Sequence, residues 1–186
     1  TAVLQLCKEL DGVTTIGTAS ASKHDYVRSH GCDHPIDYRT KDYAEEVRKI
    51  TNGRGVDVVL DALGGADWKK GYDLLRPSGM LIAFGWANMS TGSTRNLFKV
   101  IGQLTTIPKW SPIALMDANK AVAGVNLGHL WGELDMLRGQ GEALIDLYAK
   151  GKIKPHVDSS FSFADAAKAH EKLESGKSVG KIVLVP

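Results

Sequence analysis

Hydroxyl groups and one ammonium gather within a few residues near the start of the chain, in the segment VTTIGTASASK. At the end of the segment the hydroxyls of Thr18, Ser20 and Ser22 stand beside the ammonium of Lys23. Such groups bind phosphate oxygens through charge-assisted hydrogen bonds. A carboxylate would repel a phosphate, and none follows in the chain until Asp25. The residue types therefore indicate a phosphate-binding segment.

The element that must position these groups is a short strand. The apolar, β-branched run over residues 13–18 predicts it, with Gly12 before the run and Gly17 near its end. In a doubly wound nucleotide-binding fold, the end of the second strand meets the adenosine ribose, and an NAD site places an acidic residue there. The hydroxyls and Lys23 at this position favour NADP over NAD. The spacing Ser22-x-x-Asp25 also fits a helix capping box, and the two interpretations are compatible because phosphates bind at helix N-termini.

Length and composition narrow the class of protein. The chain has 186 residues and a net charge of +2 with both signs interspersed, which is not the surface of a nucleic-acid-binding protein. No apolar run approaches the roughly 20 residues that a transmembrane helix needs. Cys7 and Cys32 form no metal-type pair and no disulfide framework. We expect a cytoplasmic protein.

Strands and helices are expected to alternate along the chain. Strands are expected over residues 13–18, 34–38, 56–63, 80–85, 121–128 and 181–186, with an extended segment over 154–163. Helices are expected over residues 1–10, 22–30, 42–51, 68–75, 97–107, 134–148 and 162–175. This alternation predicts βαβ units and a doubly wound parallel α/β sheet. The run over residues 56–63 is nearly all apolar, as a strand covered on both faces would be.

Several helices carry their own signals. The spacings Asp42-x-x-Glu45 and Ser162-x-x-Asp165 predict helix N-termini. The first helix is expected to bury Val3, Leu6, Cys7 and Leu10. The long helix over 134–148 is expected to bury Leu134, Leu137, Gly141, Leu144, Ile145 and Tyr148. Because the first helix has no cap and no strand leading into it, we expect that the chain continues a longer polypeptide.

Ordered motifs carry a resemblance to a known family. They read GTASASKHDYVRSHGCDHPIDY, VDVVLDALGG, LLRPSGMLIAFG, NKAVAGVNLG and LYAKGKIKPHVDSSFSFADAAKAHEKLESGKSVGKIVLVP. Together they resemble the C-terminal half of medium-chain dehydrogenase/reductases. Within that superfamily the chain is similar to the zinc-free quinone oxidoreductase branch, near the vesicle amine transport protein group and related to zeta-crystallin. The resemblance covers essentially the whole chain.

The resemblance implies a particular domain organisation. Residues 1–153 would be a partial NADP-binding Rossmann domain that lacks its first strand and glycine-rich phosphate loop. Residues 154–186 would be a return segment belonging with a GroES-like domain that precedes this sequence. The strands over 13–18 and 56–63 would then lack a shared partner, and this piece alone would be inactive.

The resemblance also implies the residues of a cofactor site. Ser20 and Lys23 would bind the 2′-phosphate of NADPH, and Tyr38 would lie beside them at the ribose phosphate or adenine. Near the nicotinamide and its ribose, the family pattern points to Leu63, Gly64, Gly65, Phe84, Gly85, Trp86, Val125, Asn126 and Leu127. Each has a simpler alternative. Lys23 could be a solvated helix residue, Tyr38 a packing aromatic, and Gly64 and Gly65 an ordinary turn. Phe84, Val125 and Leu127 would look the same as core residues.

Catalytic and metal-binding residues are not evident. Cys32-x-His34 has no second pair of ligands, so no metal site is expected. Asp61, at the end of the strand over 56–63, is the carboxylate of most interest, and the favoured interpretation is that it caps the following loop. No proton donor is identified.

The expected function is that of an NADPH-dependent oxidoreductase that passes hydride to a quinone or an activated alkene without zinc. An enoyl reductase module of a polyketide synthase shares the fold and is an alternative. A non-catalytic dinucleotide-binding interaction protein is another, because fold does not determine function. The resemblance further implies a homodimer formed through Ala121 to Leu127, an apolar segment that would otherwise be an exposed edge.

Overall fold

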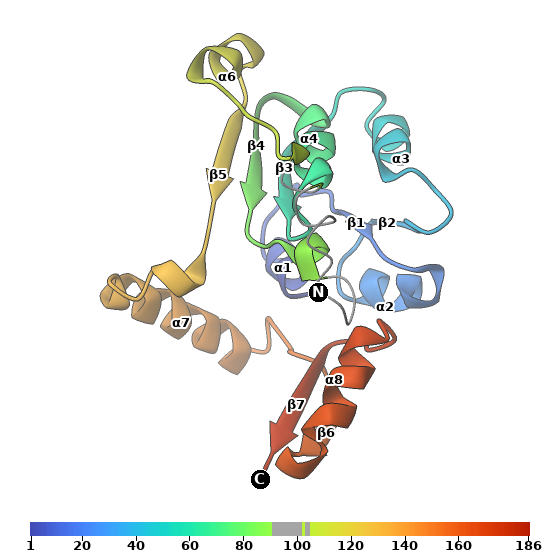
Figure 1. The fold of residues 1–186 in the computed structure, drawn as a ribbon, viewed down its shortest axis with the longest axis vertical. Coiled ribbons are helices and arrows are strands. Elements are labelled where there is room, and N and C mark those ends of the chain that lie inside the picture. The colour runs from blue at the N-terminus through green and yellow to red at the C-terminus, as the bar shows by residue number, and fades with distance from the viewer. Residues whose placement is uncertain (91–101, 103–104) are drawn as a thin grey trace. The chain divides into compact units, whose positions relative to one another are not determined.

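A computed structural model describes residues 1–90, 102 and 105–186 of the chain (Figure 1). The chain divides into two compact units. The central unit is Lys41–Leu134, and the terminal unit combines Thr1–Thr40 with Asp135–Pro186. Every strand pair that the structure describes is parallel, so the expected α/β class with parallel sheets is confirmed.

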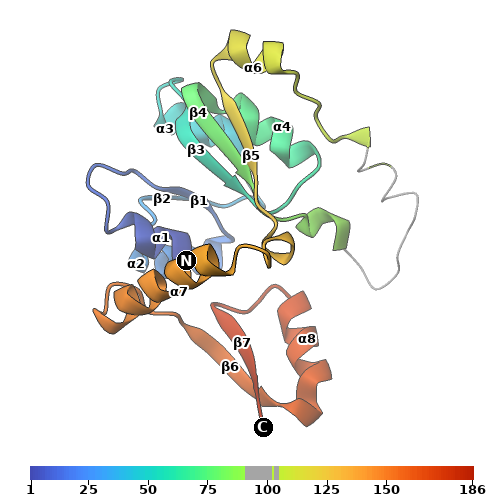
Figure 2. The same ribbon diagram turned by 90° about the vertical axis from the view of Figure 1, so that its left-hand side faces the viewer.

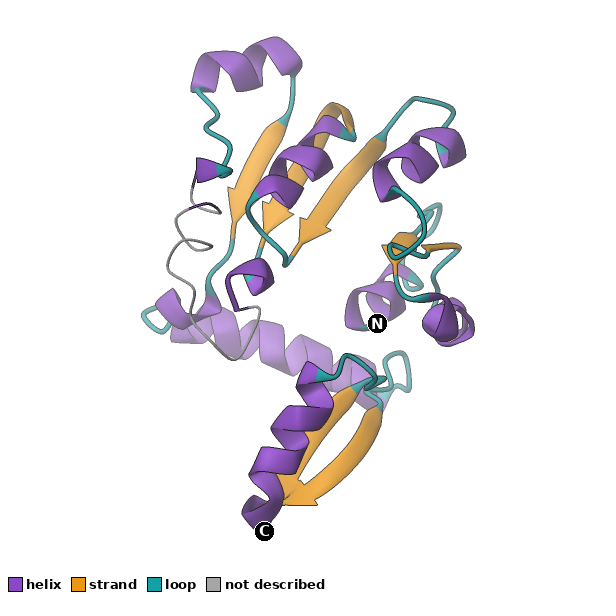
Figure 3. Ribbon diagram, turned by 45° about the vertical axis from the view of Figure 1, so that its right-hand side comes forward, coloured by secondary structure: helices purple, strands orange, loops and turns teal. Residues whose placement is uncertain are grey.

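The central unit is built on three parallel strands in the order β3-β4-β5 (Figure 3). They span Val56–Asp61 (β3), Leu75–Ala83 (β4) and Ala121–Gly124 (β5). The described helices of the unit include α3 (Tyr43–Ile50), α4 (Ala66–Asp73) and α6 (Pro112–Ala118), with 3₁₀ turns η2 (Ala87–Ser90) and η3 (Leu127–His129). The expected helix over 97–107 lies largely outside the described residues.

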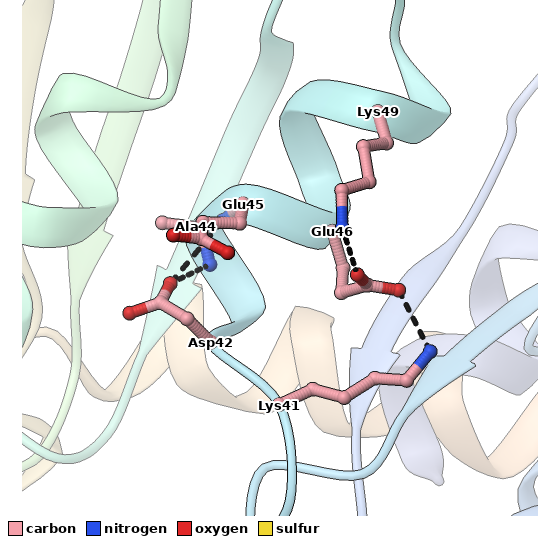
Figure 4. Close-up of polar contacts among 6 residues, drawn as sticks. All are labelled: Lys41, Asp42, Ala44, Glu45, Glu46 and Lys49. Atoms are coloured by element: carbon pink, nitrogen blue, oxygen red, sulfur yellow. Dashed lines mark hydrogen bonds and ion pairs between the residues drawn. The ribbon is translucent and has the colours of Figure 1, made fainter.

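Helix α3 begins where its sequence predicts. The Oδ1 atom of Asp42 accepts hydrogen bonds from the backbone N–H groups of Ala44 (2.7 Å) and Glu45 (3.2 Å), as Figure 4 shows. In the first turn, Glu46 accepts from Lys41 on one oxygen and from Lys49 on the other. These two ammoniums hold the pKa of Glu46 at about 2. The cap and the ion pairs together stabilise the start of α3, the first helix of the central unit.

Helix α4 covers one face of this sheet, close to β3 and β4 (Figure 2). A side chain at Gly71 would lie 2.9 Å from Val59 Cγ1, so this glycine allows the close approach. Leu81 of β4 is fully buried in the same layer. On the opposite side, Val58 is 53% exposed and Leu60 is 43% exposed. The expectation that both faces of β3 are buried is therefore wrong, because no described segment covers that second face.

The terminal unit contains two further pairs of parallel strands. One pair is β1 (Ile16–Thr18) with β2 (His34–Ile36), accompanied by α1 (Ala2–Cys7), η1 (Ala21–Lys23) and α2 (His24–Ser29). The other pair is β6 (Val157–Ser162) with β7 (Lys181–Val185), joined by η4 (Phe163–Asp165) and α8 (Ala166–Glu174), which lies along both strands (Figure 1). The long helix α7 spans Leu134–Ala149.

Strands β1 and β3 are paired with β2 and β4 respectively, and among the described residues they share no partner strand. The expectation that a strand preceding this sequence joins them stays a prediction. Residues 154–186 form a strand–helix–strand module within the terminal unit. The proposed boundary between residues 153 and 154 stays a prediction.

Two expected apolar helix faces are wrong. In α1 the buried residue is Gln5, whereas Val3 is 43% exposed. The expected inner face of α7 lies largely in solvent, with Leu144 at 46% and Ile145 at 67% exposure. Helical periodicity identifies an apolar stripe, but it does not supply a surface to cover that stripe.

Two expected capping boxes are also wrong in detail. Ser22 lies inside η1, and its hydroxyl is 3.3 Å from that of Ser20 rather than on a helix N–H. The hydroxyl of Ser162 donates to Asp165 Oδ2 at 2.9 Å and caps no backbone group. In both places a 3₁₀ turn precedes the α-helix and displaces its first N–H groups from the serine.

Among the described residues, no helix combines the length and apolar character needed to cross a membrane.

Candidate functional site

The loop after β3 is held by the carboxylate of Asp61. Its Oδ1 accepts hydrogen bonds from the backbone N–H groups of Leu63 (2.7 Å) and Gly64 (2.9 Å). Asp61 is 7% exposed, so these N–H groups satisfy a buried charge that would otherwise be costly. The favoured interpretation of Asp61 as the cap of this loop is confirmed.

The same loop is tied down from its other side by Asn88 of η2. The Asn88 amide nitrogen donates to the Gly64 carbonyl at 3.2 Å and to Asp67 Oδ2 at 2.9 Å. The Tyr43 hydroxyl lies 3.5 Å from Asp67 Oδ1. Burial raises the pKa of Tyr43, and the carboxylates of Asp67 and Asp61 raise it further, so Tyr43 stays a neutral donor. The Gly64 N–H is thus bonded to Asp61, and the Gly64 carbonyl is bonded to Asn88.

A cavity of about 640 Å³ opens at the carboxyl ends of β4 and β5. Five of the residues expected near the nicotinamide line it, and they come from two segments about 40 residues apart: Phe84, Gly85, Val125, Asn126 and Leu127. Trp86, named with them in the sequence, and Trp68 of α4 line it as well. Ligands of open parallel sheets bind outside the carboxyl ends of the strands. This cavity is therefore the candidate site of the central unit.

Backbone geometry shapes both walls of the cavity. Phe84 N–H donates to the Asp61 carbonyl (3.0 Å), and Val125 N–H donates to the Ala83 carbonyl (2.9 Å). Asn126 Oδ1 accepts from the backbone of Gly128 at 3.1 Å, which folds the chain into η3. Gly85 is required by close packing, since a Cβ there would lie 2.9 Å from the Ala62 carbonyl oxygen. The side chains of Phe84 and Leu127 remain about half or more exposed.

The indole of Trp86 rests on Gly64. A Cβ added at Gly64 would lie 3.0 Å from Trp86 Nε1 and still closer to Cδ1. The indole rings of Trp86 and Trp68 are 5.7 Å apart between centroids and tilted by 40°. Both indole nitrogens are buried, with no hydrogen-bond partner among the described residues. Gly64 and Gly65 both have positive φ, 82° and 66°, so this turn needs glycine for its backbone as well as for the space above it.

The residues expected at the 2′-phosphate lie in the terminal unit. Ser20 is 6% exposed, and Tyr38 is 53% exposed. The Lys23 ammonium donates to the carbonyls of Gly176 and Ser178, each at 2.7 Å. An ammonium has three N–H donors, so Lys23 holds the 176–178 turn and retains one donor. Ser20, Lys23 and Tyr38 thus belong to the terminal unit, whereas the residues that line the cavity belong to the central unit.

Metal-ligating side chains are scattered among the residues that the structure describes, where no group of three or more His, Cys, Asp or Glu side chains could hold a metal ion. Cys7 and Cys32 are both free thiols, and burial raises the pKa of the Cys32 thiol. A raised thiol pKa disfavours the thiolate that metals bind.

The sequence and the fold define the class of protein. The family model of zinc-binding dehydrogenases matches residues 30–184, and the chain belongs to this family, within the medium-chain dehydrogenase/reductase superfamily. It is 44% identical to the human synaptic vesicle membrane protein VAT-1 homolog over 185 residues, which cover 100% of this chain and 47% of that protein. It is 32% identical to 2-haloacrylate reductase from Burkholderia sp. over 94% of this chain and 49% of that enzyme.

A solved structure shares the fold of this chain. Escherichia coli quinone oxidoreductase complexed with NADPH superposes with a TM-score of 0.76 at 28% sequence identity, over 100% of this chain and 53% of that one. The chain spans about half the length of the relatives that it matches.

Sequence reasoning missed two residues that shape the site. Asn88 follows the cavity-lining segment by two residues, but the loop that its amide clamps lies 24 residues earlier in the chain, so no local signal points to this role. Trp68 was assigned to a helix without a role. Nothing in its sequence position shows that α4 carries it to the cavity, because that depends on the packing of Gly71 on β3.

Proposed function

We propose that the protein carrying this chain is an NADPH-dependent reductase that transfers hydride to a quinone or to another activated alkene, without zinc. The observation that carries the proposal is the shared cavity of Phe84, Gly85, Val125, Asn126 and Leu127. These residues were expected near a nicotinamide from two separate motifs. The NADPH complex of the quinone oxidoreductase and the name of the 2-haloacrylate reductase support the same cofactor and acceptor class.

The residues of the central unit would bind and orient the nicotinamide half of the cofactor. When bound, NADPH supplies the hydride. The backbone of Val125 to Leu127 would hold the carboxamide, and Gly64 and Gly65 would let the ribose approach the main chain closely. Asp61 and Asn88 keep that loop rigid from its two sides, so the loop is organised before ligand arrives. The aromatic walls, Phe84 and Trp86, would exclude water from the reacting face.

The residues of the terminal unit would recognise the 2′-phosphate. Ser20 would donate its hydroxyl, and Lys23 would use the donor that its two carbonyl partners leave over. Tyr38 would lie beside the ribose phosphate or the adenine. An unpaired phosphate dianion gains most from an ammonium that is already fixed in place.

The test compares affinities for NADPH and NADH in the whole protein that carries this chain, with and without Lys23→Ala. NADPH should bind at least about tenfold more tightly than NADH, a preference of about 1.4 kcal/mol that Lys23→Ala removes. Because Lys23 also holds the 176–178 turn, a purely structural role would weaken both cofactors alike. Lys177→Ala, in the same turn, is the control and should leave the ratio unchanged. Equal binding of the two cofactors in the unaltered protein would refute the phosphate assignment.

Steady-state oxidation of NADPH with a quinone or an enone separates enzyme from binding protein. Turnover supports the proposed reductase, and tight NADPH binding without turnover of either acceptor class favours the interaction protein.

We further propose a cytoplasmic homodimer formed through Ala121 to Leu127. One edge of β5 pairs with no strand that the structure describes, and this edge and its apolar residues support the proposal. A monomer in sedimentation at micromolar concentration would contradict it.

A further inference from the structure

A second cavity, of about 230 Å³, lies in the terminal unit and is strongly basic. Lys8, Lys152 and Lys154 line it together with His30. Among the described residues that line it, none carries a carboxylate. Like charges repel one another, so a cavity lined by three lysines and no carboxylate favours an anion inside it.

The cavity is assembled by a buried amide. Gln5, the buried residue of α1, donates from Nε2 to the Lys154 carbonyl at 3.2 Å and accepts from the Lys154 N–H at 2.5 Å. This two-bond clamp holds the segment after α7 against α1, across 149 positions of sequence. A buried polar side chain on the packed face of a short helix is costly unless its hydrogen bonds are made. The clamp brings the lysines of two distant segments together.

The three ammoniums are only partly neutralised. Lys8 donates to the backbone carbonyl of Ser29 at 2.9 Å, which leaves its charge uncompensated. Lys152 is paired with Glu9 at 3.0 Å. The Lys154 ammonium makes no hydrogen bond or ion pair with any residue that the structure describes. The walls therefore keep a net positive charge, with at least one donor available to a ligand.

This cavity is separate from the expected 2′-phosphate position. Lys23 directly precedes α2, whereas Ser29 is the last residue of that helix and His30 follows it. A helix of six residues is about 9 Å long. The two basic regions thus lie at opposite ends of α2, within one unit.

We propose that the cavity binds an anion of the phosphate class, through Lys8, Lys152 and Lys154. Three lysines that line one cavity offer more N–H donors than a single carboxylate can use, and the several oxygens of a phosphate or pyrophosphate group match them better. The group can come from a free phosphorylated small molecule or from a phosphate headgroup, and both would be recognised by the same side chains.

The test is calorimetric titration of sodium pyrophosphate into the whole protein that carries this chain, in phosphate-free buffer. The protein carries Lys23→Ala, so that the expected 2′-phosphate position does not contribute. Lys154→Ala and Lys152→Ala should each weaken binding about tenfold. Lys109→Ala removes one exposed lysine of the central unit and should leave the affinity unchanged. Thermal melting of each variant shows whether the fold is kept, and Lys154→Ala removes no side-chain bond to any residue that the structure describes.

Three results would overturn the proposal: no heat with millimolar pyrophosphate, equal weakening by Lys109→Ala and Lys154→Ala, or binding that is present before Lys23→Ala and lost with it. Flotation with phosphatidylcholine vesicles, with and without phosphatidic acid, distinguishes the source of the phosphate. Flotation that needs phosphatidic acid and Lys154 identifies a headgroup. Pyrophosphate binding without flotation identifies a free phosphate.

Discussion

Substitution of Gly64 by alanine tests the geometry of the candidate site most directly. Gly64 has φ of 82°, a conformation that costs a residue with a Cβ about 1 to 2 kcal/mol. The new methyl group would also meet the Trp86 indole, whose Nε1 would lie 3.0 Å away. Overpacking of this kind costs about 1 to 3 kcal/mol more. We expect Gly64→Ala to lower the free energy of unfolding by about 2 to 5 kcal/mol.

Gly53→Ala is the matched control for that experiment. Gly53 has φ of 78°, and a Cβ there would meet nothing within 4 Å. This variant therefore measures the backbone term alone, about 1 to 2 kcal/mol. Gly64→Ala should also be made in a Trp86→Ala background. There it should lower the free energy of unfolding only as much as Gly53→Ala does, because the indole that the new methyl group would meet is gone.

The assay is urea unfolding, followed by far-ultraviolet circular dichroism so that the loss of a tryptophan does not alter the signal. Equal destabilisation by Gly64→Ala and Gly53→Ala would refute the packing of Trp86 on Gly64. An excess that persists in the Trp86→Ala background would place the clash elsewhere. NADPH affinity of the variants adds a functional reading, since a displaced indole should alter the cavity that Trp86 lines.

Three further predictions concern single groups. Asp61→Ala should destabilise the protein more than Asp61→Asn in urea unfolding, because the asparagine oxygen still accepts from the Leu63 and Gly64 N–H groups; equal effects would argue against the cap. The Lys172 ammonium and the Val179 N–H hold the pKa of Asp158 at about 2, so its contribution to stability is present above its unfolded pKa of about 4 and is lost as pH falls towards 2. The stability difference between the unaltered protein and Asp158→Asn should shrink over that range, and a constant difference would contradict it. Cys32 is 3% exposed with a raised pKa, so a thiol reagent should label Cys7 first and Cys32 only on unfolding; Cys7→Ser is the control, and rapid labelling of that variant would refute the assignment.

Local signals in the sequence predicted the elements of the fold well. Asp42 caps α3 as its spacing indicates, and Asn52 and Gly53 end that helix with positive φ. These features depend on residues a few positions apart, so local hydrogen bonds and backbone conformation determine them. The role of Asp61 was predictable for the same reason, because a carboxylate at a strand end can reach only the next few N–H groups.

Burial was predicted less well. The apolar stripe of α7 and the second face of β3 read as core residues, yet Ile145 and Val58 are largely exposed. A stripe in the sequence reports a tendency to be covered, whereas burial depends on a second segment being present at that surface. Gln5 shows the converse, since a polar residue became the buried one of α1 when Lys154 supplied both of its partners.

The sequence by itself determined the alternation of strands and helices, the parallel α/β class, and the family, because each is written in local pattern and ordered motifs. Tertiary structure alone decided that Trp86 lies on Gly64, that Lys23 binds the carbonyls of Gly176 and Ser178, and that Lys8 meets Lys152 and Lys154 at one cavity. The physical reason is the separation along the chain of the residues that interact. Caps and periodicity act within a turn or two of chain, whereas these contacts join segments separated by about 20 to 150 residues, and only packing fixes which of them meet.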